Sequence, residues 1–175
     1  MLYPSLPSRV KVVTAFIYSR EQVYNDTKKI LQRKFGDVDF ESAHLEFNFT
    51  NYYSQEMGER LFRRFISFKR LVSADALLKI KLFCINIEKK FAVKNKRKIN
   101  IDPGYLNEAK LVLATTKDFY HRLYLGKGIY AEVTLYYRGR GFCDFATTYP
   151  DYRTPQYKKV FEAMRDIYRQ QIKKV

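Results

Sequence analysis

Stretches with the two-residue period of a β-strand alternate along this chain with stretches that have the 3.6-residue period of an α-helix. This alternation favours folds in which helices pack on a sheet. The first strand is rich in β-branched and aromatic residues, and the first helix is expected to begin with Ser19 as its N-cap and to end at Gly36. The predicted order over the first two-thirds of the chain is strand, helix, strand, strand, helix, strand, at residues 9–18, 20–36, 43–50, 61–71, 73–93 and 99–101.

This order is the β-α-β-β-α-β pattern of ferredoxin-like folds, in which an antiparallel sheet carries its helices on one face. The next strand segment is expected at residues 109–115. Because Asp-Pro-Gly is typical of turns, residues 102–104 are expected to form a turn between this segment and the strand at residues 99–101.

The last third of the chain predicts a hairpin and a helix. Residues 129–137 alternate apolar and polar side chains, and Gly139 and Gly141 mark a turn into a second strand. Gly126-Lys127-Gly128 lacks the long glycine-rich loop of a phosphate-binding motif, so we interpret it as a hairpin turn as well. Thr154-Pro155 is typical of a helix start. We therefore predict a single α+β domain over residues 1–175, with a mostly antiparallel sheet, helices packed on one face, and an added hairpin and C-terminal helix.

The chain is strongly basic, with a formal net charge of +15 at pH 7. This charge favours an anionic partner, either nucleic acid or an anionic small molecule, and solvated basic side chains on helix surfaces are the alternative interpretation. No apolar run approaches the ~20 residues that span a bilayer, and residues 1–7 lack the pattern of a signal peptide. We therefore expect a cytoplasmic protein without a membrane partner.

Cysteine and histidine are too few and too scattered for a structural zinc site. Cys84 and Cys143 are expected to be reduced core residues, and His44 and His121 lie far apart in the sequence. No metal is predicted, and the cofactor is left unknown.

Residues 115–122 form the densest polar segment. If they form a helical turn, Asp118, His121 and Arg122 share a face, where a carboxylate could orient an imidazole beside a guanidinium. A capped turn with a structural histidine is the alternative. Glu132 lies in the middle of a predicted strand, where its carboxylate could bind Mg²⁺ or pair with an arginine. An ordinary solvated strand face is the alternative.

Basic and aromatic residues also alternate between residues 62 and 70, and more basic residues follow the second helix. Such a pattern can bind single-stranded nucleic acid through phosphate pairing and base stacking. The residues that this hypothesis would use are Arg63, Arg64, Lys94, Lys96, Arg97 and Lys98.

Several segments together resemble a prokaryotic family, domain-of-unknown-function family 4416, nearly from end to end. Among them are Asn-Ile-Asp-Pro-Gly-Tyr-Leu at residues 100–106 and Lys-Leu-Val-Leu-Ala-Thr-Thr-Lys-Asp-Phe at residues 110–119. The others are residues 49–53, 56–58, 64–68, 80–83, 121–122, 128–135 and 148–153. The resemblance implies no activity, but it marks a set of polar residues as part of the family pattern: Tyr52, Tyr53, Asp102, Tyr105, Lys110, Lys117, Asp118, His121, Arg122, Glu132, Tyr149 and Asp151.

Three hypotheses follow. In the first, a small phosphorylated or otherwise anionic ligand is bound by Lys110, Lys117 and Arg122. His121, oriented by Asp118, would be the acid or base, and Glu132 would be a second carboxylate or a metal ligand. The ligand-binding set is completed by Tyr52, Tyr53, Asp102, Tyr105, Tyr149 and Asp151. The second hypothesis is a nucleic-acid-binding module, and the third is an interaction module such as a homodimer paired through a sheet edge. Whether the protein is an enzyme is left open.

Overall fold

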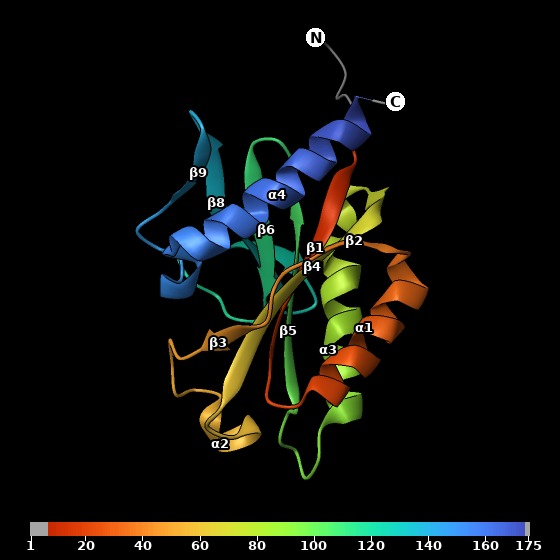
Figure 1. Ribbon diagram of the computed structural model, residues 1–175, viewed down its shortest axis with the longest axis vertical. Coiled ribbons are helices and arrows are strands. Elements are labelled where there is room, and N and C mark those ends of the chain that lie inside the picture. The colour runs from red at the N-terminus through yellow and green to blue at the C-terminus, as the bar shows by residue number, and fades with distance from the viewer. Residues whose placement is uncertain (1–6, 174–175) are drawn as a thin grey trace.

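The computed structural model describes residues 7–173 (Figure 1). Within this range the chain is an α+β protein with one antiparallel sheet and helices packed on it. Residues 1–6, on which most of the expectation about a signal peptide rests, lie outside the described residues. The elements are, in order, β1 (Val10–Tyr18), α1 (Glu21–Phe35), β2 (Val38–Glu41), β3 (Leu45–Phe47), α2 (Ser54–Met57), β4 (Leu61–Val72), the 3-10 helix η1 (Ala74–Ala76), α3 (Leu77–Phe91), β5 (Ile99–Leu106), β6 (Lys110–Thr115), β7 (Leu123–Gly126), β8 (Ile129–Arg138), β9 (Gly141–Asp144), the 3-10 helix η2 (Pro150–Arg153) and α4 (Pro155–Ile172).

The strand order of the sheet is β2-β4-β1-β5-β6-β8-β7, with β3 also paired to β4 and β9 to β8. Strands β1 and β2 are joined by α1, yet β4 lies between them in the sheet. This is the split β-α-β arrangement of the ferredoxin-like unit, and β5 completes that unit on the other side of β1. The predicted fold class is confirmed, as are the β8–β9 hairpin and the C-terminal helix.

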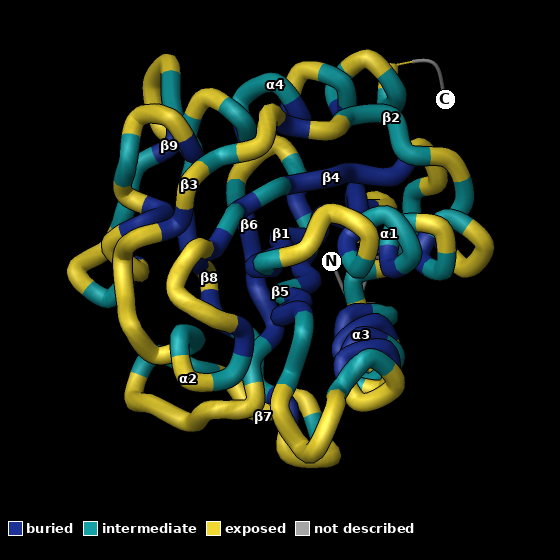
Figure 2. Tube along the Cα trace, turned by 60° about the horizontal axis from the view of Figure 1, so that its bottom comes forward, coloured by how far each residue is buried: buried dark blue, intermediate teal, exposed yellow. Residues whose placement is uncertain are grey.

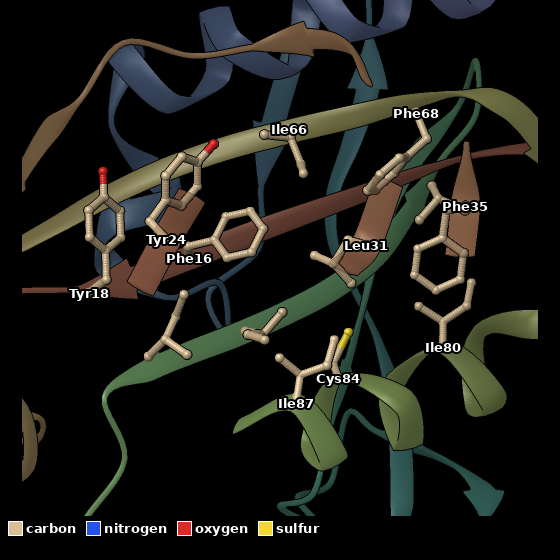
Figure 3. Close-up of a cluster of buried hydrophobic side chains, with 13 residues drawn as sticks. Phe16, Tyr18, Tyr24, Leu31, Phe35, Ile66, Phe68, Ile80, Cys84 and Ile87 are labelled. Carbon is tan, nitrogen blue, oxygen red and sulfur yellow. The ribbon is translucent and has the colours of Figure 1, made fainter. Parts of the chain in front are cut away.

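The sheet is covered on both faces, as side chains of β1 show. Val12, Phe16 and Tyr18 pack into a core cluster with α1 and α3, which Figure 3 shows in close-up. The alternate residues Val13 and Ala15 pack into a second cluster with α4. Figure 2 agrees, since α4 and α3 lie on opposite sides of the β4–β1–β5 strands. The ferredoxin-like helices α1 and α3 share one face as predicted, whereas α4 covers the opposite face with its apolar stripe.

Three local predictions were wrong. Asp102-Pro103-Gly104 lies inside β5 and forms no turn, because these residues pair with β1 along their whole length. The turn comes later, at Asn107, whose side-chain oxygen accepts from the amides of Ala109 and Lys110 at 3.0 and 2.9 Å. The strand predicted at residues 43–50 is limited to β3, and α1 has Arg20 at its N-cap position instead of Ser19, without a side-chain cap bond.

Other turn and cap predictions were confirmed. The chain turns between β7 and β8 at Lys127 and Gly128, both with positive φ (52° and 74°). Thr154 caps α4, with its hydroxyl accepting from the amide of Tyr157 at 3.3 Å. Among the described residues no helix is both long and apolar enough to cross a membrane.

Candidate ligand-binding site

The sheet opens between β5 and β6. All of β5 pairs with β1, but only Gly104, Tyr105 and Leu106 pair with β6. The rest of β5 therefore continues past the last rung of the β5–β6 ladder with no partner on that side (Figure 1). At the last shared rung the strands come very close, because a Cβ on Gly104 would lie 2.3 Å from the carbonyl oxygen of Val112. Beyond this rung lies a cavity of about 420 Å³, the size of many small-molecule sites.

Both sides of the sheet contribute to this cavity because the strands have separated. Helix α3 supplies Lys81 and Glu88, whereas β4 supplies Arg63 and the η2 segment supplies Asp151. Exposed aromatic side chains from the segment between β3 and α2, among them Tyr52, line it as well. The opening thus joins charged side chains that a continuous sheet would keep apart.

Arg63 is the most deeply buried cation of the cavity, with 3% of its surface exposed. Its Nη2 donates to Asp151 Oδ2 at 2.7 Å, and its Nη1 lies 3.5 Å from Asp102 Oδ2. The guanidinium carbon lies 4.8 Å from the ring centre of Phe47 and 5.6 Å from that of Tyr152. Its Nε and Nη1 have no hydrogen-bond partner among the described residues. Such unpaired buried donors are rare in proteins, and these N–H groups could donate to an acceptor on a bound molecule.

A second charged group lies on the α3 side of the cavity. Lys81 Nζ donates to the carbonyl of Ile101 at 3.0 Å and lies 3.8 Å from Asp102 Oδ1. Glu88 Oε1 accepts from the amide of Ile101 at 2.5 Å. Burial raises the pKa of Glu88 to about 7, against the opposing effect of Lys81. Glu88 therefore changes its charge near neutral pH, at the wall of the cavity.

Cations also hold the segment that carries Tyr52 and Tyr53. Arg97 forms a two-pronged ion pair with Glu56 of α2, with both N–O distances at 2.8 Å, and its guanidinium lies over both tyrosine rings. Lys117 Nζ lies 4.7 Å from the ring centre of Tyr52. This short segment is thus held by basic side chains from two different parts of the chain.

The structure brings together much of the predicted ligand set, although its members come from different elements. The predicted residues that line the cavity are Tyr52, Tyr53, Asp102, Lys117, Glu132, Tyr149 and Asp151. Tyr105, Lys110 and His121 lie instead along a separate groove that also touches Glu132, and Asp118 is exposed and lines neither space.

The predicted pairing of His121 with Asp118 was wrong. Residues 116–121 form no helix, so Asp118 and His121 do not share a helical face. The carboxylate beside His121 is that of Glu132, at 3.1 Å from Nε2. The same carboxylate accepts from Arg122 Nε at 2.7 Å, and Arg122 Nη2 donates to the hydroxyl of Tyr149, also at 2.7 Å. Arg122 therefore ties β8 to the segment before η2, and most of its donors are already engaged.

The residues of the nucleic-acid hypothesis do not form one surface. Arg63 is buried in the cavity, Arg64 pairs with Glu21 and Glu41, and Arg97 pairs with Glu56. Lys94 and Lys96 are exposed and Lys98 is half-buried, all in the turn before β5. Of the six residues, Lys94 and Lys96 are therefore the most available for phosphate contacts, whereas Lys98 Nζ already donates to the carbonyl of Glu56 at 3.5 Å.

Among the cavity residues that the sequence analysis missed are three polar side chains: Lys81, Glu88 and Asn100. A signal was present, because Lys81 and Glu88 lie on the buried face of α3 with Leu77 and Cys84, where a charged residue is out of place. The part of the chain that the structure describes contains no group of three or more His, Cys, Asp or Glu side chains that could hold a metal ion.

The comparisons with known proteins give a family and no activity. Residues 8–168 match the family model described as Domain of unknown function (DUF4416). Neither a curated protein nor a solved structure matches the chain.

Proposed function

The chain belongs to the DUF4416 family, and we propose that it is a cytoplasmic protein that binds a small anionic or phosphorylated molecule in the cavity between β5 and β6. The observation that carries this proposal is Arg63, a buried cation with unpaired N–H groups on the wall of that cavity. Two free cysteines, Cys84 and Cys143, support a reducing compartment.

The cavity lining carries four acidic and four basic side chains, so we infer the anionic character of the ligand from which of their polar atoms are already paired. The carboxylates of Asp151 and Glu132 already accept from arginine, and that of Asp102 accepts from Asn100 at 2.8 Å. Donors remain at Arg63, and the ammonium of the exposed Lys117 lies over the ring of Tyr52 and pairs with no carboxylate of residues 7–173. A ligand that brings negatively charged oxygens would satisfy these donors with charge-assisted hydrogen bonds.

The aromatic side chains suit a ligand with an apolar or planar part beside its anionic group. Tyr52 and Tyr149 are 56% and 40% exposed, and both line the cavity. Aromatic rings of this kind supply contact area at small cost in conformational entropy. Segments that carry the family resemblance, including residues 100–106 and 148–153, border the same cavity. Glu88 would be available for proton transfer if the bound molecule reacts.

A thermal-shift titration with inorganic phosphate, a sugar phosphate and a dicarboxylate tests the proposal. At about 100 times its dissociation constant, a ligand adds about 2.7 kcal/mol to the free energy of unfolding, which a melting curve resolves. We expect at least one compound to stabilise the wild type in a saturable way. Lys117→Ala should weaken this effect at least tenfold, because it removes a cation from the cavity.

Two matched variants test whether the ligand binds in the cavity. Thr116→Trp should block binding by filling the cavity, whereas Asp118→Trp, two residues away on an exposed position outside the cavity, should not. Equal binding by the wild type, Lys117→Ala and Thr116→Trp would show that the cavity is not the site. The nucleic-acid alternative instead requires affinity for single-stranded RNA or DNA that falls steeply with salt and depends on Lys94, Lys96 and Lys98.

A further inference from the structure

A groove on the face of the sheet that packs on α3 takes no part in the proposed function. It has a volume of about 380 Å³ and runs between the start of α3 and the strands β5, β6, β8 and β7. Leu77 and Leu78 form its helical side, and Val112 and Val133 contribute from the sheet. Its size falls within the range of small-molecule sites.

The walls of this groove are mainly apolar and open to water. Leu123 and Leu125 of β7 are 74% and 37% exposed, and Val133 of β8 is 38% exposed. In Figure 2 the segment around β7 lies at the rim of the molecule and is mostly exposed. Exposed apolar side chains that gather around one concave space are typical of a ligand-binding groove.

The two ends of the groove differ in polarity. Lys110 begins β6 and pairs with Tyr136 of β8. Leu125 lies near the other end of β8, since the residue before it pairs with Tyr130. The groove therefore runs roughly 15–20 Å along the strands, from a polar end at Lys110 to an apolar end at Leu125.

Lys110 is the half-buried charge of the groove that lacks a counter-ion. Within the described part of the chain its ammonium forms no ion pair, and the hydroxyl of Tyr105, which lines the same groove, has no hydrogen-bond partner. Two carboxylates also line the groove, but Glu132 already accepts from Arg122 and Asp75 is exposed to water. The free donors favour an anionic head group, and the neighbouring carboxylates favour a head group with one negative charge over a phosphate dianion.

We propose that this groove binds an amphiphilic carboxylate, such as a medium-chain fatty acid, with its head group at Lys110 and its alkyl chain along the leucines of α3 and β7. The chain covers apolar surface that is otherwise in water, and the carboxylate gives the ammonium a charge-assisted hydrogen bond. Tyr105, Lys110 and His121 were predicted from the sequence to bind an anionic ligand, and all three line this groove. The proposal does not rest on a ligand between β5 and β6, because the two spaces share only Glu132.

Calorimetric titration of the full chain with octanoate, decanoate and dodecanoate tests the proposal. We expect saturable binding that tightens by up to roughly fourfold for each added methylene group. Decanol and decylamine, which lack the negative charge, should bind about tenfold more weakly than decanoate. The absence of saturable binding, or binding of decylamine as tight as that of decanoate, would overturn the proposal.

Two pairs of variants test whether the groove is the site. Lys110→Gln should weaken decanoate binding about tenfold and remove its advantage over decanol, whereas Lys127→Gln, at an exposed lysine outside the groove, should do neither. Val133→Trp fills the groove and should abolish binding, whereas Val93→Trp, at an exposed valine outside the groove, should leave it unchanged. Thr116→Trp should also leave it unchanged, because Thr116 lines only the cavity between β5 and β6. Full binding by both Lys110→Gln and Val133→Trp would place the fatty acid elsewhere and overturn the proposal.

Discussion

At the scale of single residues, the cavity holds charges that are costly to bury. Arg63 lies among aromatic rings and is compensated by Asp151 and, at longer range, by Asp102. Burial raises the pKa of Asp151, although Arg63 opposes this shift. Each partner therefore depends on the other, since an isolated buried charge is far more costly than a pair.

Removing Arg63 should destabilise the fold strongly. Arg63→Met leaves the buried carboxylate of Asp151 without its cation, and we expect a loss of about 3–5 kcal/mol in the free energy of unfolding, measured by chemical denaturation. Adding Asp151→Asn should recover part of this loss. Arg60→Met is the matched control, because the Arg60 side chain is 81% exposed and the change should stay within about 0.5 kcal/mol. A loss as small as that of the control would mean that the Arg63–Asp151 pair contributes little.

Glu88 should make the stability depend on pH. Its pKa is raised from 4.5 to about 7 in the folded protein, so the folded state holds a proton that the unfolded state releases. Stability should therefore fall as pH rises from about 4.5 to 7, by up to about 3 kcal/mol from this residue. Glu88→Gln, which is always neutral and keeps an oxygen for the amide of Ile101, should match the wild type near pH 5 and exceed it near pH 8. Parallel melting temperatures of the two proteins across this range would contradict the raised pKa.

At the scale of elements, the end of the β5–β6 pairing determines where the cavity begins. Gly104 permits the close approach of the strands at their last shared rung, and beyond it β5 follows β1 alone. Local turn chemistry could not predict this, because Asp102-Pro103-Gly104 is typical of a turn and pairing with β1 overrides that preference. Proline has no N–H for a ladder hydrogen bond, and it is tolerated here at the point where β5 has lost its partner β6.

A side chain at position 104 should push strands β5 and β6 apart. Gly104→Ala places a methyl group 2.3 Å from a backbone oxygen and 2.7 Å from Leu113 Cδ2, so we expect a loss of about 1–3 kcal/mol in denaturant unfolding. Gly141→Ala is the control, because its nearest neighbour is the flexible end of Glu162 at 3.1 Å. If Gly104→Ala cost no more than Gly141→Ala, the close approach of β5 and β6 would not be a constraint on the fold.

The ion pair between Arg97 and Glu56 should hold α2 locally without stabilising the whole fold by much. Its partners are each 27% exposed, and the hydrogen bonds from Arg97 lower the pKa of Glu56. Glu56→Gln should therefore cost no more than about 1 kcal/mol globally, and the wild type should lose this contribution as pH falls through the lowered pKa of Glu56. Hydrogen exchange should nevertheless become faster at the amides of Met57 and Gly58, which close the helix. Unchanged exchange at these amides would show that the pair does not hold the segment.

At the scale of the whole molecule, the fold was predictable and the cavity was not. The spacing of apolar side chains in residues 9–18, 61–71 and 129–137 is a local property of the sequence. It predicted the correct elements and the ferredoxin-like order. The cavity is non-local, since it needs the separation of β5 and β6 and side chains from both faces. Residues such as Asp102 and Asp151 were singled out from the sequence, but their common neighbour Arg63 was assigned to a nucleic-acid surface because nothing local indicates its burial.

Mapping of backbone amide shifts by NMR tests whether this cavity is a binding site. The wild-type protein would be titrated with inorganic phosphate, a sugar phosphate and a dicarboxylate, with the Thr116→Trp variant in parallel. We expect saturable shifts at Ile101, Asp102 and Lys117, and their loss in Thr116→Trp. The absence of any saturable shift, or shifts confined to the basic turn at residues 94–98, would contradict the proposed site.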